Sequence, residues 1–301
     1  MPAIEIQQLT KNYGNNKGIF DVSFQIEEGE VFGFLGPNGA GKTTTIRHLL
    51  GFTKPQSGKA AILGLDTWKQ AKEIQQHLGY LPAEIAFPAN MTGTQIIQHT
   101  ANMRGLQDMT KAHQLIEMFD LDPTALIKRM SKGMKQKVGI VCAFMHDPKI
   151  LILDEPTTGL DPLMQSVFVK LIHQEKQKGK SILMSSHLFE EIEGTCDRIA
   201  MIKHGKLIST MNSQDFKNFD RTTYKITFRD LQNLQDFQKE GFILSEIQEE
   251  ALHLTLEIED LQINELLRAL SKRDVISIRE MEYSLEDYFM NYYKEGDYSH
   301  V

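Results

Sequence analysis

A glycine-rich segment with one lysine and one threonine has the spacing of a phosphate-binding loop. Residues 36–43 read GPNGAGKT and match the pattern G-x-x-x-x-G-K-[ST]. The segment follows an apolar run at Val31–Leu35 and opens a helix-like stretch at Lys42–Leu50, which is the context that supports the match. Glycines let the backbone turn its N–H groups toward an anion, and a helix N-terminus adds a positive dipole end. The segment therefore predicts binding of a nucleoside triphosphate.

The side chains of this loop have distinct expected roles. We expect the Lys42 ammonium to reach the β and γ phosphates of ATP, and the Thr43 hydroxyl to be a ligand of Mg²⁺. ATP and Mg²⁺ are therefore the expected cofactors. The predicted nucleotide-binding residues of the loop are Gly36, Pro37, Asn38, Gly39, Ala40, Gly41, Lys42, Thr43 and Thr44.

Two adjacent carboxylates end an apolar run further along the chain. Residues 150–155 read ILILDE, the pattern of a strand that is buried on both faces and ends in Asp154 and Glu155. In open α/β sheets, ligands bind beyond the carboxyl ends of the strands. We expect Asp154 to hold Mg²⁺ through water, and Glu155 to orient and deprotonate the water that attacks ATP. Taken alone, the segment could be only a capped strand, but the phosphate-binding loop upstream favours catalysis.

Strand-like and helix-like segments alternate through the first two-thirds of the chain. Further strands are expected at Ala3–Leu9, Ile19–Ile26, Ser181–Ser185 and Arg198–Ile202. The stretch from Thr92 to Asp147 lacks strand patterns and predicts helices, with Thr92 and Ser131 as N-caps. This order predicts an α/β core with an inserted helical subdomain at about residues 84–147.

The pattern changes after about Asn212. Strands are expected at Thr223–Phe228, Phe242–Ile247, Leu252–Ile258 and Val275–Arg279, and helices at Leu231–Lys239 and Leu261–Lys272. This β-α-β-β-α-β order is that of a ferredoxin-like unit, and a last helix is expected at Ser284–Lys294. We therefore predict two domains, residues 1–215 and 216–301, of which the second is a small α+β domain.

The composition and the lack of long apolar runs argue against a disordered, membrane-spanning or secreted protein. Hydrophobic residues make up 41% of the chain and charged residues 24%, as in an ordinary globular protein. No run approaches the roughly 18 apolar residues of a membrane span, and the N-terminus lacks the basic and apolar regions of a signal peptide. The two cysteines, Cys142 and Cys196, are expected to be buried thiols. Together these features predict a cytoplasmic chain.

The net charge of −7 is concentrated in the last part of the sequence. From Phe216 onward there are 10 Lys and Arg against 18 Asp and Glu. Neutralising a phosphate backbone requires clustered Lys and Arg. Nucleic acid is therefore not an expected partner.

With these motifs the chain resembles the ABC ATPase family over most of residues 1–210. The signature of that family, Leu-Ser-Gly-Gly-Gln, has its counterpart in MSKGM at residues 130–134, where Ser131 and Gly133 match and Lys132 and Met134 do not. The resemblance implies a P-loop ABC ATPase core that works as a dimer. It also implies that Ser131 and Gly133, at a helix N-terminus, bind the γ-phosphate held by the opposite subunit. Taken alone, Ser131 would be interpreted as a helix cap.

Three further residues take their expected roles from the same resemblance. PTTGLD at residues 156–161 resembles the D-loop that links the two subunits, which adds Asp161 to the nucleotide-binding residues. Tyr13 resembles the aromatic residue that stacks on adenine. His187, after two serines at a strand end, resembles the switch histidine that contacts the γ-phosphate, and joins Glu155 as a catalytic residue.

One segment departs from the family pattern. The family usually has a glutamine directly after Gly-Tyr-x-Pro, whereas here GYLP at residues 79–82 is followed by Ala83 and Glu84. Alanine cannot bind a metal ion. We therefore consider Glu84 as a substitute Mg²⁺ ligand, because a carboxylate is a hard oxygen ligand. The alternative is a solvated charge on an exposed loop.

The resemblance implies the ATP-hydrolysing subunit of an ABC transporter, an exporter of a drug, peptide or lipid-like substrate. A separate transmembrane permease is expected, and SLEDYFMNY at residues 284–292 resembles the tails of subunits paired with ABC-2 permeases. The second ATPase subunit could be identical or different, and both would lie on the cytoplasmic face of the cell membrane. One alternative is a soluble ABC ATPase acting on ribosomes or DNA. Another is a regulator without hydrolysis, against which Glu155 and His187 argue.

Overall fold

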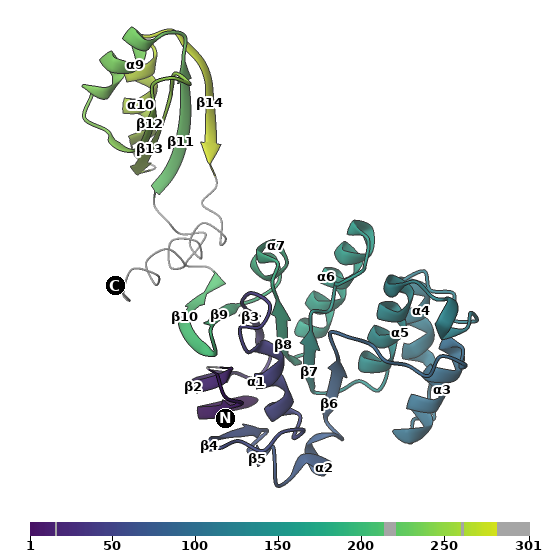
Figure 1. The fold of residues 1–301 in the computed structure, drawn as a ribbon. Coiled ribbons are helices and arrows are strands. Elements are labelled where there is room, and N and C mark those ends of the chain that lie inside the picture. The colour runs from purple at the N-terminus through teal and green to yellow at the C-terminus, as the bar shows by residue number, and fades with distance from the viewer. Residues whose placement is uncertain (16, 214–220, 260–261, 282–301) are drawn as a thin grey trace. The chain divides into compact units, whose positions relative to one another are not determined.

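The computed structural model describes residues 1–15, 17–213, 221–259 and 262–281. The chain divides into two compact units, Met1–Ser213 and Gln214–Val301 (Figure 1). Each unit has a hydrophobic core of its own. The N-terminal unit contains every residue for which a role in nucleotide chemistry is expected.

A six-stranded sheet forms the centre of the N-terminal unit, in the order β10-β9-β3-β8-β7-β6. Neighbouring strands are parallel except in the β9–β10 hairpin. Strands β3, β7 and β8 are buried along their whole length, as the continuous apolar runs of β3 and β7 predict. The strands are β3 (Val31–Leu35), β6 (Leu78–Leu81), β7 (Ile150–Asp154), β8 (Ser181–Ser186), β9 (Arg198–Lys203) and β10 (Lys206–Asn212).

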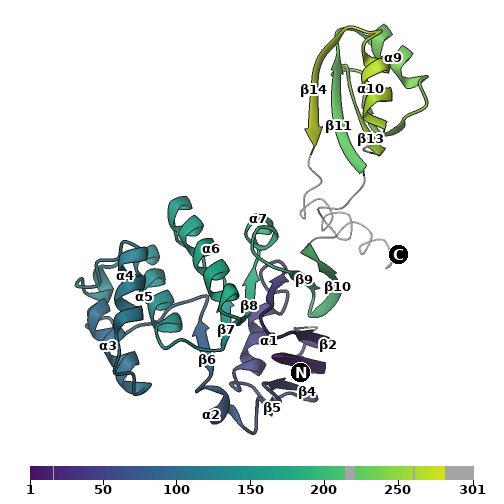
Figure 2. The ribbon, with the colours of Figure 1, turned by 180° about the vertical axis from the view of Figure 1, so that it is seen from behind.

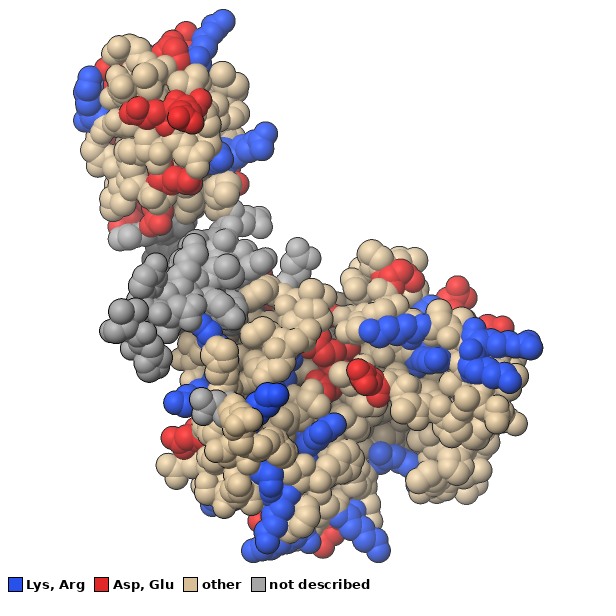
Figure 3. Space-filling view, in the orientation of Figure 1, with Lys and Arg blue, Asp and Glu red and all other residues tan. Residues whose placement is uncertain are grey.

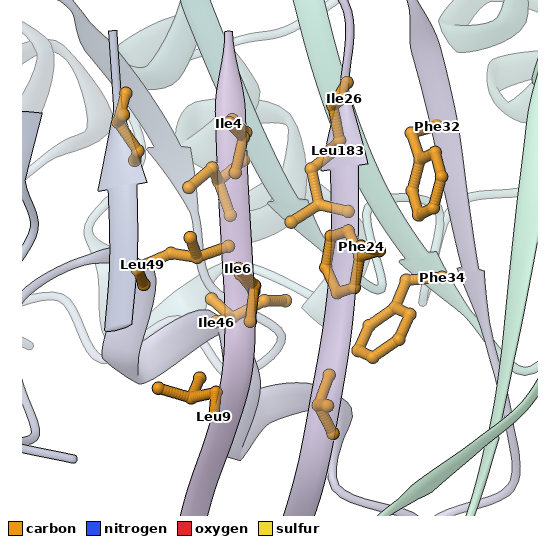
Figure 4. Packing of buried hydrophobic residues seen from close by; sticks show 14 of the residues in the cluster. Ile4, Ile6, Leu9, Phe24, Ile26, Phe32, Phe34, Ile46, Leu49 and Leu183 are labelled. Atoms are coloured by element: carbon orange, nitrogen blue, oxygen red, sulfur yellow. The ribbon is translucent and has the colours of Figure 1, made fainter. Parts of the chain in front are cut away.

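A second, antiparallel sheet contributes to the same core. Its order is β2-β1-β4-β5, with β1 (Ile4–Asn12), β2 (Gly18–Ile26), β4 (Ser57–Ile62) and β5 (Leu65–Asp66). Phe24 of β2 stacks on Phe32 of β3 with ring centroids 5.1 Å apart, and Ile46 of the helix after β3 joins the cluster (Figure 4). This core fixes the carboxyl end of β3, from which the phosphate-binding loop starts.

The helices of the N-terminal unit are α1 (Lys42–Leu49), α2 (Ala71–Ile74), α3 (Gly93–Met103), α4 (Thr110–Met118), the 3₁₀ helix η1 (Ile127–Arg129), α5 (Lys132–Phe144), α6 (Pro162–Gln177) and α7 (Phe189–Glu193). The predicted caps are confirmed: Thr92 forms a capping box with Gln95, and Ser131 accepts from the Met134 N–H. Helices α3 and α4 pack against α5, and both ribbon views place the three at one side of the unit (Figures 1 and 2).

The C-terminal unit has the β-α-β-β-α-β order of a ferredoxin-like fold. Its antiparallel sheet has the order β12-β13-β11-β14, and α9 and α10 contribute Leu234 and Leu266 to the core beside Ile226 and Leu254 of the sheet. The elements are β11 (Arg221–Phe228), α9 (Leu231–Gln238), β12 (Ile243–Gln248), β13 (His253–Glu259), α10 (Ile263–Leu270) and β14 (Val275–Met281). The helix predicted at Ser284–Lys294 lies outside the described residues.

None of the helices in the described ranges is both long enough and apolar enough to cross a membrane. On the face drawn in Figure 3, Lys and Arg side chains are spread over the N-terminal unit and reach the region of α3–α5. The C-terminal unit shows both signs of charge on the same face (Figure 3).

Candidate functional site

The loop between β3 and α1 has a backbone that only glycine adopts easily. Gly39 and Gly41 have φ angles of 80° and 116°, in the left-handed region, and Gly41 is the N-cap of α1. A Cβ atom at Gly36 would lie 2.4 Å from the Ile202 carbonyl oxygen, so this position also needs glycine. The loop therefore folds closely against β9 and presents the first turn of α1 to a ligand, as the motif predicts.

Lys42 lies in the first turn of α1 with its ammonium held inside the loop. Its side chain is buried, and Nζ donates to the Gly36 carbonyl oxygen at 2.5 Å. The same Nζ lies 3.1 Å from Oε1 of Glu155. The loop lysine and the predicted catalytic base are therefore direct neighbours, although they are 113 positions apart in the sequence.

Asp154 ends β7 beside the next residue of α1. The Thr43 hydroxyl donates to Asp154 Oδ2 at 2.9 Å, and the Ser185 hydroxyl of β8 donates to Oδ1 at 2.5 Å. Burial raises the pKa of Asp154, while the hydrogen bonds from Ser185 and Thr43 oppose that rise. The adjacent hydroxyl and carboxylate are hard oxygen donors, which are the ligands that Mg²⁺ prefers. This pair therefore fits a Mg²⁺ ion that is held partly by the protein and partly by phosphate.

Glu155 has a strained backbone, and its carboxylate contacts both Lys42 and His187. Its φ angle is 51°, which is uncommon for a residue with a side chain, and its N–H donates to the Ser185 carbonyl oxygen at 3.1 Å. Oε1 faces Lys42, and Oε2 lies 2.5 Å from Nδ1 of His187. The side chain of Glu155 is 13% exposed and that of His187 is 41% exposed. This arrangement directs one carboxylate toward the mouth of the loop, where it could accept a proton from water.

A cavity of about 590 Å³ opens over these groups. Of the residues from Gly36 to Thr44, all but Gly36 and Ala40 line it, together with Glu155. Tyr13 also lines the cavity and is 56% exposed, and the Lys11 ammonium lies over its ring, 5.7 Å from the centroid. The structure thus brings together the loop, the catalytic base and the aromatic residue that the sequence predicted separately.

Four lining residues, Lys17, Gly18, Ala83 and His204, were not among the predicted site residues. Lys17 follows the Tyr13 loop, and His204 lies in the β9–β10 turn with a φ angle of 48°. The Gly205 N–H donates to the Ala40 carbonyl oxygen at 2.8 Å, which ties this turn to the phosphate-binding loop. No sequence pattern indicated His204, because its place depends on a hairpin that closes onto a loop more than 160 residues earlier.

The structure does not bring Glu84 to the Thr43–Asp154 pair. Ala83 lines the cavity, whereas Glu84 is exposed and is not among the lining residues. An exposed carboxylate is well solvated, and no contact of the described residues draws it inward. The geometry therefore favours the solvated charge over the Mg²⁺ ligand at this position.

Ser131, Gly133 and Asp161 also lie outside the cavity lining. Ser131 caps α5, and Asp161 caps α6 by accepting from the Met164 N–H at 3.0 Å. A Cβ atom at Gly133 would lie 2.5 Å from the Gly159 carbonyl oxygen, so the signature segment packs directly on the predicted D-loop. Within one chain these residues have structural roles, and contact with nucleotide would require a second copy.

Gln136 of α5 connects this helix to the segment that follows β7, and the sequence analysis did not predict this role. Its side chain is 2% exposed, and its amide donates to the Pro156 carbonyl oxygen at 2.7 Å. The bond fixes the backbone directly after Glu155. The sequence shows only one glutamine among the apolar residues of this helix, and such a residue often occurs in a core without a functional role.

Comparison with known proteins identifies the family. A family model described as "ABC transporter" matches residues 19–158. "Bacitracin transport ATP-binding protein BcrA" from Bacillus licheniformis is 34% identical over 297 residues, covering 95% of this chain and 96% of that protein. "Linearmycin resistance ATP-binding protein LnrL" from Bacillus subtilis is 34% identical over 217 residues, 70% of each chain.

A solved structure has the same fold. It is described as "Structure of ATP binding subunit of ABC transporter", with a TM-score of 0.65 and 30% identity over 71% of this chain and 92% of that one. The match to BcrA spans nearly the full length of both chains. The chain therefore belongs to the ATP-binding subunits of the ABC transporter family and is an ATPase.

Proposed function

We propose that this chain hydrolyses MgATP at the cavity lined by Lys42 and Glu155, with His187 in contact with Glu155, as the motor subunit of an exporter. The observation that carries the proposal is the position of Glu155, whose two carboxylate oxygens face Lys42 and His187 at the mouth of the phosphate-binding loop. A base at this point can take the proton of water as it attacks the γ-phosphate. Lys42 and the N-terminus of α1 offset the charge of the phosphates.

The proposed metal site consists of Thr43 and Asp154, whose oxygens already lie 2.9 Å apart. When bound, Mg²⁺ would offset the negative charge on the phosphates. No group of three or more His, Cys, Asp or Glu side chains suited to a metal ion occurs among the described residues. A site with few protein ligands agrees with Mg²⁺, which usually keeps several waters and takes further oxygens from phosphate.

The proposed working unit is a dimer. Ser131, Gly133 and Asp161 stand apart from the cavity of their own chain, and Ser131 marks the exposed N-terminal end of α5. A second copy placed head to tail would bring this helix end to the γ-phosphate in the opposite cavity. Closure of the two copies on ATP and their release after hydrolysis would supply the movement for transport.

The proposed partner is a separate permease, of the ABC-2 type, with the ATPase on the cytoplasmic face of the membrane. The names of the relatives BcrA and LnrL support export of a drug, peptide or lipid-like compound. Bacitracin and linearmycin are therefore the first compounds to test.

The test is purification of the tagged full chain from its native cells, followed by identification of the membrane protein that comes with it. Co-expression of both should raise the bacitracin or linearmycin concentration that a sensitive host tolerates, and Glu155→Gln should remove the protection. Association with ribosomes or DNA in place of a membrane protein would refute the transport assignment and leave the ATPase assignment standing.

A further inference from the structure

The short helix α7 begins two residues after His187 and is fixed over the central sheet. Ile192 of α7 is fully buried, and a Cβ atom at Gly33 of β3 would lie 2.6 Å from its Cγ2 atom. The backbone of β3 thus leaves room for this isoleucine only because Gly33 has no side chain. The packing of Ile192 therefore fixes the position of the neighbouring Glu191 relative to the central sheet.

The Glu191 carboxylate holds the turn that carries His187. The Ser186 hydroxyl donates to Glu191 Oε2 at 2.6 Å and accepts from the Leu188 N–H at 2.9 Å, so its two bonds span His187. Ser186 is fully buried, and its carbonyl oxygen accepts from the Gly36 N–H at 3.3 Å. One serine thus joins α7, the histidine turn and the first residue of the phosphate-binding loop.

The charges around Glu191 belong mainly to the proposed active site. The pKa of Glu191 is raised to about 6: burial is the largest cause, the Ser186 hydrogen bond opposes it, the Glu155 charge adds to the rise and His187 lowers it. Strands β3 and β8, which pack against α7, carry no ionisable side chain. The buried Cys196 thiol after α7 also faces this carboxylate.

We propose that Glu191 is a positioning residue for ATP hydrolysis: through Ser186, its carboxylate fixes the turn that presents His187 to Glu155. The inference rests on the roles proposed above for Glu155 and His187. Glu191 acts on hydrolysis only through the turn. Its loss should therefore lower kcat and leave ATP binding, which depends on the phosphate-binding loop, nearly unchanged.

The test compares the full-length chain with Glu191→Ala, Ser186→Ala, the double variant and Glu191→Gln. Each alanine variant should lower kcat about tenfold with little change in KM for ATP, because a misplaced catalytic group costs one to two orders of magnitude. The double variant should be no slower than the slower single variant, since both changes remove the same bond. Glu191→Gln keeps an acceptor oxygen and should recover most of kcat. The matched control is Glu193→Ala on the same helix, which should match the unmodified chain.

A pH profile separates positioning from a purely structural role. Glu191 becomes mostly neutral as the pH falls well below 6, so the kcat of Glu191→Gln should approach that of the unmodified chain there and stay slightly below it above pH 6. An additive double variant, an equal loss in Glu193→Ala, or a change in KM alone would overturn the proposal. If Glu191→Ala fails to fold, Ser186→Ala and Glu191→Gln carry the same comparison.

The variants Glu155→Gln and His187→Ala distinguish this inference from the proposed active site. If both leave hydrolysis unchanged, the proposed site is wrong and the positioning role is wrong with it. If both abolish hydrolysis while Glu191→Ala and Ser186→Ala do not lower it, only the positioning role is wrong.

Discussion

Two groups of ionisable side chains lie in the N-terminal unit, each around an acid with little exposed surface, and they differ in what surrounds them. The proposed catalytic group, called the catalytic group below, is Lys42, Glu155 and His187 at the carboxyl ends of β3, β7 and β8, of which Lys42 and Glu155 line the cavity. The structural group comprises Lys111, Asp147, Glu175, Lys178 and Lys180. It joins α4 to the start of β8 and to α6, away from the cavity lining.

The acids of the structural group and two acids next to the catalytic group have net pKa shifts of opposite sign. Burial of Glu175 raises its pKa. Hydrogen bonds from Lys178 and Lys180 and the charge of Lys111 together lower it by more than burial raises it, so the net shift is downward. Hydrogen bonds from Lys111 and Lys180 likewise lower the pKa of Asp147. Beside the catalytic group, by contrast, burial outweighs the hydrogen bonds and raises the pKa values of Asp154 and Glu191.

The opposite signs of the pKa shifts indicate different roles for the two groups. Acids surrounded by more lysines than they can pair with remain ionised and hold elements together. Asp154 and Glu191 accept hydrogen bonds from hydroxyl groups and not from lysines, and their pKa values stay raised, as is common for acids at functional sites. A buried acid alone therefore does not mark an active site.

The largest effect is expected from Glu155→Gln. The substitution keeps the size of the side chain but removes the proton acceptor, so ATP turnover should fall about a thousandfold, within the range of general-base loss. The variant should accumulate as an ATP-bound dimer, seen by size-exclusion chromatography in MgATP, while its melting temperature stays close to that of the unmodified chain. Undiminished phosphate release would contradict the assignment of Glu155 as the base.

Glu175→Ala should have the largest effect on folding. Removing a carboxylate that is 1% exposed takes one of two acidic partners from Lys180, which is itself 7% exposed, and should cost about 3 kcal/mol of unfolding free energy. Urea denaturation measures the loss. The matched control is Glu117→Ala on α4, an exposed glutamate for which no change is expected. Equal stability of the two variants would show that the structural group does not hold the fold together.

A smaller effect is expected on how the free energy of unfolding depends on pH, and it should differ between Glu191, next to the catalytic group, and Glu175 of the structural group. The pKa of Glu191 is raised to about 6 in the folded chain, so its ionised form opposes folding above pH 6, and this cost disappears as the pH falls toward 4.5. Glu191→Gln should therefore stabilise the chain by about 1 kcal/mol at pH 7.5 and by almost nothing at pH 4.5.

Glu175→Gln should show the opposite dependence in the same urea denaturation series. Its lowered pKa makes the carboxylate stabilising above the unfolded value, and this contribution is lost as the pH falls through the folded value. The destabilisation caused by Glu175→Gln should therefore shrink at acid pH. Parallel pH curves for the Glu191 and Glu175 variants would remove the distinction between the two groups.

The smallest effect is expected from Glu84→Ala. The side chain is exposed and lies outside the cavity lining, so the hydrolysis rate and its Mg²⁺ dependence should both stay unchanged. A Mg²⁺ titration of phosphate release measures both. A weaker Mg²⁺ dependence would restore Glu84 as a metal ligand and extend the catalytic group.

The sequence predicted the elements and motifs that depend on interactions between residues close together in the chain. Apolar runs predicted β3 and β7. The glycines of the phosphate-binding loop predicted a left-handed backbone, which the φ angles of Gly39 and Gly41 confirm. The caps of α3 and α5 followed from Thr92 and Ser131 for the same reason. Strand β4 was missed, because SGKAAI begins with residues of low strand propensity and is held by pairing with β1.

The contacts of the site depend on long-range folding and could not be predicted from the sequence. Ser186 looked like the end of a strand, yet it is bonded to Glu191 and Gly36. Gln136 and His204 gave no signal for similar reasons, since each acts on a segment brought near only by the fold. Asp161 and Ser131 show the converse: the motif predicted nucleotide contact, and the single chain shows helix caps.

The most direct test of the central claim is single-turnover hydrolysis by Glu155→Gln and Glu175→Gln, measured side by side at a temperature at which both are folded and saturated with MgATP. If only the group beside the cavity does chemistry, Glu155→Gln should bind ATP and release almost no phosphate, whereas Glu175→Gln should release it at the rate of the unmodified chain. Normal phosphate release by Glu155→Gln, or an equal loss in both variants at full occupancy, would contradict the account.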